Sequence, residues 1–200
     1  NLEWLSCSHN SLTTLDISRN LKLIKLDCGE NRLSELNVNN NIALRYLYCY
    51  NNNLNNLDIS NNPELEILEC YDNAHLQIES IDNVMFRRNP YGTGIRVLDT
   101  TNNLKLKVLK CSSNEIASLD LSKNSQLLHL DCDDNCIEIL DVSTTQLNHY
   151  VPKTIVYSEY PLKCKMASLK ALYLKRDWRL KGINDTFPVC IARNTQIIYK

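Results

Sequence analysis

The six residues 129–134, HLDCDD, combine the side chains of a thiol nucleophile, a general base and carboxylates. A cysteine attacks as its thiolate, and an imidazole within hydrogen-bonding distance takes the proton. On an extended strand, side chains alternate, so His129, Asp131 and Asp133 face outward while Cys132 faces the core. A thiol and an imidazole on opposite faces cannot form a hydrogen bond. We therefore predict no catalytic site here and no enzymatic activity in this chain.

The outward acids beside His129 are also potential ligands of a cation. No ligand spacing accompanies them, so a solvated acidic patch is the preferred interpretation, and neither a metal nor another cofactor is predicted. The formal net charge is −1, without the basic excess of a nucleic-acid-binding protein. No apolar run approaches the roughly 18 residues of a membrane span. We expect neither nucleic acid nor a membrane span among its interactions.

Cys132 belongs to a repeat. The pattern L-x-x-L-x-C-x-x-N-x-L recurs with a spacing of 21 residues, and it starts at Leu2, Leu23, Leu44, Leu65, Leu106 and Leu127. Its cysteines form one column: Cys7, Cys28, Cys49, Cys70, Cys111 and Cys132. A fixed period of this kind is the signature of a solenoid, in which each repeat is one turn.

The stretch between the fourth and the next clean turn has the length of one further turn. We interpret residues 86–105 as a degenerate fifth turn, with Phe86 at the first leucine position and Tyr91 at the cysteine position. Ile95, Leu98 and Asn103 then restore the pattern. This interpretation predicts a solenoid of seven turns over residues 1–146.

The repeated pattern resembles the leucine-rich-repeat consensus, with cysteine at a core position that leucine usually holds. The second half of each turn, L-D-x-S-x-N, resembles the short bacterial repeats of surface, secreted and host-directed proteins. The resemblance covers about residues 1–146. It implies a right-handed solenoid of α/β type, with a mostly parallel sheet on the concave face and little helix in the repeats.

Polar columns accompany the repeat. The asparagine at the ninth position is expected to bind backbone groups where each strand ends. The aspartate column that includes Asp16 and Asp58 is expected to brace convex corners, although a shared functional row is the alternative. For the cysteine column we prefer a ladder of buried thiols to disulfides. Cys136, Cys164 and Cys190 lie outside that column and are the candidates for pairing or reactivity.

The outward positions of the strands give the candidate binding face. They are Trp4, Lys25, Asp27, Tyr46, Tyr48, Tyr50, Ile67, Glu69, Tyr71 and Arg88, with Val108 and His129 further along the same row. Tyrosine, tryptophan and arginine dominate binding hot spots. The alternative is that the rings pack across strands for stability alone.

The repeat fails after Val142, and residues 147–200 are predicted to cap the solenoid. We expect an added strand at Thr154–Tyr157, a helix over about 166–180 and a β-hairpin over about 187–199. An independent functional domain is the alternative for this tail. The first turn is uncovered, so we expect that the natural protein continues upstream or that this chain is a trimmed fragment.

The predicted function is recognition of a protein partner by the concave face of a monomer, without chemistry. One alternative is a substrate-targeting module of a larger enzyme whose catalytic domain lies outside this chain. Another is a structural spacer or an adhesin array. The resemblance favours a secreted, surface-bound or host-delivered protein.

Overall fold

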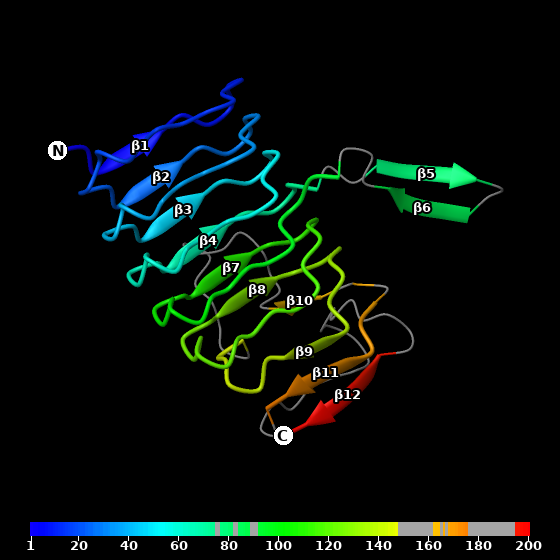
Figure 1. Ribbon diagram of the computed structural model, residues 1–200. Helices are drawn as coiled ribbons and strands as arrows, with labels where there is room; N and C mark the ends of the chain where they lie inside the picture. The colour runs from blue at the N-terminus through cyan, green and yellow to red at the C-terminus, as the bar shows by residue number, and fades with distance from the viewer. Residues whose placement is uncertain are drawn as a thin grey trace.

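The computed structural model describes residues 1–74, 77–81, 84–88, 92–147, 162–164, 166, 168–175 and 195–200, and for 77–81 and 84–88 it describes the backbone. Successive turns of the chain stack side by side, and each contributes one short strand to a common sheet (Figure 1). No helix occurs among the described residues, and therefore none in that part of the chain could cross a membrane. The expected absence of α-helix from the convex segments is confirmed for the described turns.

The main sheet has seven parallel strands in one unbroken register. They are β1 (Trp4–Ser6), β2 (Lys25–Asp27), β3 (Tyr46–Tyr48), β4 (Ile67–Glu69), β7 (Val108–Lys110), β8 (His129–Asp131) and β10 (Leu162–Lys163). The central leucine of each strand pairs with the central leucine of the next, as in Leu26 with Leu47. Side chains alternate along a strand, so the leucines lie on the buried face and their neighbours face outward.

Leucines and cysteines at equivalent positions of successive turns build one continuous core. Leu47, Cys49, Leu54 and Leu57 show how one turn contributes to it, since each is at most 3% exposed. Every described cysteine is a free thiol, and the column from Cys28 to Cys132 is fully buried. The thiol ladder predicted from the sequence is confirmed over these residues.

The ninth-position asparagines form a second internal ladder. The side-chain amide of Asn52 donates to the carbonyls of Cys28, Cys49 and Tyr50, and its Oδ1 accepts from the amide of Leu33 at 2.9 Å. One side chain therefore satisfies backbone groups of two adjacent turns at the point where the strand ends. The predicted role of this column is confirmed.

The aspartate column braces the convex corners, as predicted. In Asp16, Asp58, Asp99, Asp120 and Asp141 one carboxylate oxygen accepts the backbone amide two residues later. Hydrogen bonds to the residue two positions later hold the pKa of each of the first four carboxyls below its usual value, and for Asp141 the hydrogen bond from Lys200 lowers the pKa most. An exposed carboxylate that bonds its own backbone fixes a turn, which is the structural role.

The degenerate turn predicted over 86–105 is wrong. β4 pairs directly with β7, with Ile67 opposite Val108, so no strand of an additional turn lies between them. Two antiparallel strands, β5 (Gln77–Ile81) and β6 (Val84–Arg88), instead pair with each other and project from the side of the solenoid (Figure 1). A hairpin pairs its own backbone, so it can leave a corner without interrupting the stack.

The chain rejoins the solenoid at Gly94. The Gly94 amide donates to the carbonyl of Leu54, as the Asn53 amide does to Leu33 one turn earlier. Asn103 then donates to Asn62, the position that an unbroken repeat would give it. The segment between Ala74 and Ile95 is therefore an insertion within the fourth turn, and Tyr91 lies outside the described residues.

The C-terminal region continues the repeat where the sequence suggested a helix. β10 pairs with β8, and Cys132 donates its backbone amide to Lys163. Cys164, Leu169, Leu172 and Leu174 are buried in the same core. The placement of Cys164 outside the cysteine column is therefore wrong.

The helix predicted over 166–180 is wrong where the structure describes it. Ala171–Leu174 is strand β11, which pairs in parallel with β9 (Ile139–Asp141) and β12 (Gln196–Tyr199). Apolar residues at 166, 169, 172 and 173 fit a helical face, but Leu169, Leu172 and Leu174 equally match the convex half of a repeat. Stacking on Ile137, Leu140 and Val142 decides between the two patterns.

The predicted hairpin is described only in its second arm, β12, whose described partner is the parallel strand β11. The first arm, residues 187–191, lies outside the described residues, and so does the strand expected at 154–157. Capping by the tail as a whole stays a prediction.

Candidate functional site

The outward face of β1 to β4, here called the sheet face, presents the predicted binding residues. Parallel pairing aligns Trp4 with Lys25, Tyr46 and Ile67 in one row, and Ser6 with Asp27, Tyr48 and Glu69 in the next. Tyr50 and Tyr71 follow their strands by two residues and form a third row. The register brings together all of the predicted residues except Arg88.

Tyr50 and Tyr71 form a stacked aromatic pair. Their ring centroids are 4.8 Å apart and the planes differ by 6°. On the other side, the Tyr50 ring lies against Gly29, where a Cβ atom would come within 2.6 Å of the ring. The absence of a side chain at Gly29 therefore makes room for the Tyr50 ring, which lies between Gly29 and Tyr71, and the two stacked rings form a fixed platform.

Two cations lie over the remaining tyrosines. The Lys25 ammonium is 5.3 Å from the Tyr48 ring centroid, and the Arg45 guanidinium is 5.3 Å from that of Tyr46. Contacts of this kind are worth about 0.5–1 kcal/mol at exposed sites. They hold the rings in place while leaving them partly accessible.

The sheet face also carries internal ion pairs. Lys110 Nζ lies 2.8 Å from Glu69, and Lys163 Nζ lies 3.1 Å from Asp131. Each pair joins adjacent strands, so these lysines form ion pairs with carboxylates of the same sheet. The pairs stabilise the strand register across the C-terminal half of the face.

The tyrosine hydroxyls stay protonated at physiological pH. Burial, together with the Glu69 and Asp27 carboxylates, raises the pKa of Tyr48 to about 12. Burial and neighbouring acids also raise the pKa of Tyr50 and Tyr71. The face therefore offers neutral rings and hydroxyl donors, which suit contact with a partner rather than nucleophilic attack.

Three predicted positions depart from the expected face. Arg88 lies in β6, outside the main sheet, because β4 pairs with β7 and not with the predicted fifth turn. Val108 and His129 occupy the predicted row but are fully buried. The prediction that His129 faces solvent is therefore wrong, and the accessible part of the row extends from Trp4 to Ile67.

Cys132 lies in the core, as predicted. Its thiol is fully buried, and burial raises its pKa well above the ordinary value. A protonated buried thiol is a poor nucleophile. Among the described residues, no group of three or more His, Cys, Asp or Glu side chains is placed to hold a metal ion.

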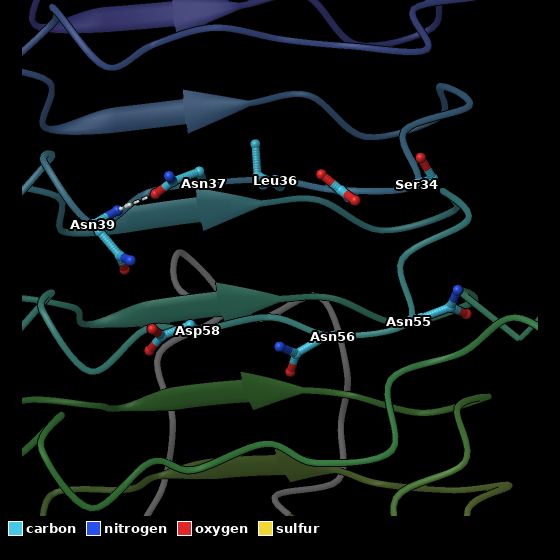
Figure 2. Close-up of a pocket in the computed structure, with 8 residues that line it drawn as sticks. Ser34, Leu36, Asn37, Asn39, Asn55, Asn56 and Asp58 are labelled. Atoms are coloured by element: carbon cyan, nitrogen blue, oxygen red, sulfur yellow. Dashed lines mark hydrogen bonds between the residues drawn. The ribbon is translucent and has the colours of Figure 1, made fainter.

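A shallow depression on the convex side escaped the sequence analysis. Figure 2 shows it between the second and third turns, with a volume of about 350 Å³. It is lined by Ser34, Glu35, Leu36, Asn37, Asn39, Asn55, Asn56 and Asp58. Asn37 accepts the backbone amide of Asn39 in the corner bracing described above. Asn37 and Asp58 brace two neighbouring corners, and the stacking of turns brings the lining residues together.

Stacked parallel strands with a 21-residue period and a buried Leu-x-Cys column make the fold a leucine-rich-repeat solenoid. The chain is similar to the solved leucine-rich repeat domain of APL1B, with 17% identity over 86% of this chain and a TM-score of 0.51. It is also similar to the functional domain of InlJ from Listeria monocytogenes, whose structure includes a cysteine ladder, with 28% identity over 88% of this chain and a TM-score of 0.48.

The chain spans less than half the length of these two solved chains, covering 40% of the InlJ chain and 48% of the APL1B chain. No protein-family model matches the sequence, and no curated protein matches it. The likeness to the APL1B domain concerns the fold.

Proposed function

We propose that this protein binds a protein partner through the concave sheet face, centred on Tyr46, Tyr48, Tyr50 and Tyr71. The observation that carries the proposal is the stacked Tyr50–Tyr71 pair beside Tyr48 on a rigid parallel sheet. All four rings are half-buried, so each retains surface for a partner. Preorganised aromatic side chains lose little conformational entropy on binding, which favours affinity.

The competing explanation is that the rings only stabilise the sheet. The core of these turns is already complete without them, because the leucines and cysteines beneath are fully buried. The aromatic residues are also concentrated on β3 and β4 rather than distributed along the sheet. A local cluster of partly accessible aromatic side chains is typical of an interaction surface.

The finer parts of the proposal rest on the repeat type. Short repeats with L-D-x-S-x-N halves favour a bacterial surface, secreted or host-directed protein that acts as a monomer. The alternative is a substrate-targeting module whose catalytic domain lies outside this chain. In either case the binding chemistry belongs to the sheet face.

The test uses the full chain as bait, with partners identified by mass spectrometry and affinities then measured on purified components. Tyr48→Ala and Tyr71→Ala should each weaken binding by about 1–3 kcal/mol while circular dichroism and melting temperature show a folded protein. The matched control is Ile42→Ala, which removes a side chain that is 62% exposed outside the sheet face. Loss of binding in the control, with full affinity in the tyrosine variants, would assign the function to another surface.

A further inference from the structure

The carboxyl end of the strands forms a rim with a distinctive charge. Two residues of each turn follow the column cysteine and line this rim: Ser8, His9, Gly29, Glu30, Tyr50, Asn51, Tyr71, Asp72, Ser112, Ser113, Asp133 and Asp134. Backbone hydrogen bonds hold neighbouring turns together here, as between the amide of Glu30 and the carbonyl of Tyr50. The rim is thus a continuous ribbon, and the stacked tyrosines lie in its middle.

In the turns from Cys7 to Cys132 these positions hold four carboxylates and neither lysine nor arginine, whereas Lys165 follows Cys164 in the next turn of the sequence. The acids are Glu30, Asp72, Asp133 and Asp134. Glu30 and Asp72 stand one turn on either side of Asn51 and adopt left-handed backbone conformations, with φ of 53° and 54°. On the tyrosine side, His9 Nδ1 lies 2.7 Å from Glu30. The rim therefore presents net negative charge beside an aromatic platform.

The opposite rim of the same sheet is electrically balanced. There Glu66 lies between Arg45 and Lys107, with N–O distances of 2.5 and 2.9 Å. Stacked opposite charges neutralise one another and leave little field for a partner. The contrast shows that the acidic charge belongs to one edge of the binding face rather than to the protein as a whole, whose net charge is −1.

The pKa values of the two stacked tyrosines reflect the nearby negative charge. Glu30, Glu69 and Asp72 all contribute to raising the pKa of Tyr71, after burial. Asp27 and Glu30 do the same for Tyr50. A partner cation that approaches these rings meets both the carboxylates and the negative faces of the rings, and the two attractions add.

We propose that the acidic rim and the Tyr50–Tyr71 platform bind a basic segment of the partner, with lysine or arginine side chains contacting the accessible surface of the tyrosine pair between Glu30 and Asp72. This inference depends on the proposed function, because it names the partner chemistry of the same face. Charge complementarity selects the occupant: an acidic segment would meet like charge, and an apolar one would leave the carboxylates desolvated without partners.

In the test, the full chain is titrated with two peptides of equal length. One peptide alternates glycine and arginine, and the other alternates glycine and glutamate. Binding is followed through the shifts of the backbone amide NMR signals. The arginine peptide should shift the signals of residues 29–30, 50–51 and 71–72, with an affinity that falls as salt is added. Glu30→Gln combined with Asp72→Asn should weaken its binding about fivefold or more.

The matched control is Glu35→Gln combined with Asp120→Asn, which changes the net charge equally at exposed acids of the convex side. If both double variants weakened peptide binding equally, the effect would come from net charge alone, and the inference would be overturned. Comparable binding of the glutamate peptide, or shifts confined to the Arg45 rim, would overturn it as well. A natural partner that is lost on Tyr71→Ala but retained by the Glu30 and Asp72 variant would leave the proposed function intact and refute the basic partner.

Discussion

In the turn of β3, Leu47 and Cys49 enter the core and Asn52 hydrogen-bonds the backbone of the adjoining turns. In the turn of β10, Leu162 and Cys164 occupy the same two core positions. The sequence does not repeat the asparagine there, since residue 167, which corresponds to Asn135, is alanine. The two turns therefore share their apolar pattern and differ in their polar one.

The backbone of the C-terminal turn is satisfied in a different way. Lys170 and Ala171 donate their amides to Glu138, and Val142 donates to Tyr173, so β9, β11 and β12 form a second parallel sheet on the flank. The corresponding segments of the N-terminal turns make no strands. The comparison teaches that the core pattern sets the stacking, whereas the polar residues determine which backbone groups pair with which.

The core should be the most sensitive feature of both turns. Leu47→Ala should reduce the free energy of unfolding by about 2–5 kcal/mol, because it leaves a cavity in a turn packed on both sides. Leu172→Ala should also be costly, since Leu172 is fully buried. Urea unfolding measures both. If only Leu47→Ala were destabilising, β11 would not belong to the same core.

The buried asparagines of the ladder should contribute to stability, whereas an exposed asparagine outside the ladder should not. Asn52→Ala should cost about 2–4 kcal/mol, because it leaves buried carbonyls and the Leu33 amide without partners. The control Asn61→Ala removes an exposed amide and should change stability by less than about 0.5 kcal/mol. Equal effects in urea unfolding would show that the ladder contributes nothing specific.

The cysteine column should behave alike in the turn of β3 and in the turn of β10. Cys49→Ala and Cys164→Ala should each cost about 1–2 kcal/mol, because both thiols are fully buried small hydrophobes. A thiol reagent should modify the exposed Cys136 in the native protein, whereas the buried column cysteines from Cys28 to Cys164 should react only on unfolding. Rapid native labelling of Cys164 would remove it from the column.

Removal of the inserted hairpin should have a small effect. Excision of residues 75–94, which joins Ala74 to Ile95, restores the 21-residue spacing and leaves β4 beside β7. We expect the stability to change by less than about 1 kcal/mol, because loop length affects stability weakly. Thermal unfolding measures this change. A collapse of cooperativity would indicate that the segment contributes to the core, as a degenerate turn would.

The smallest expected effect is a loss of stability at alkaline pH that arises from Tyr48 in the N-terminal turns. Folding raises the pKa of Tyr48 from 10.0 to about 12, so the native state holds the proton more tightly than the unfolded state. The resulting stability is fully present below pH 10 and is lost as the pH rises toward 12. Tyr48→Phe should flatten this decline in unfolding experiments. An ordinary tyrosine titration, followed by ultraviolet absorbance, would contradict it.

The sequence predicted the face well where the repeat is regular. Tyr46, Tyr48, Tyr50 and Tyr71 lie where alternation places them, because strand register follows directly from the period. It failed at Arg88, whose assignment depended on treating an insertion as a turn. It also failed at His129, since alternation fixes the side of a strand on which a residue lies but not what covers that side.

The sequence by itself determined the leucine and cysteine columns, the asparagine and aspartate bracing and the row of tyrosines. Each of these depends on contacts between neighbouring turns at a constant spacing, so the period contains the information. Only the tertiary structure decided that β4 meets β7, that Cys164 and Leu172 extend the core, and that Val108 and His129 are buried. Those outcomes depend on which of several distant segments pairs with a given strand edge or covers a given apolar surface. A local sequence pattern does not contain that information.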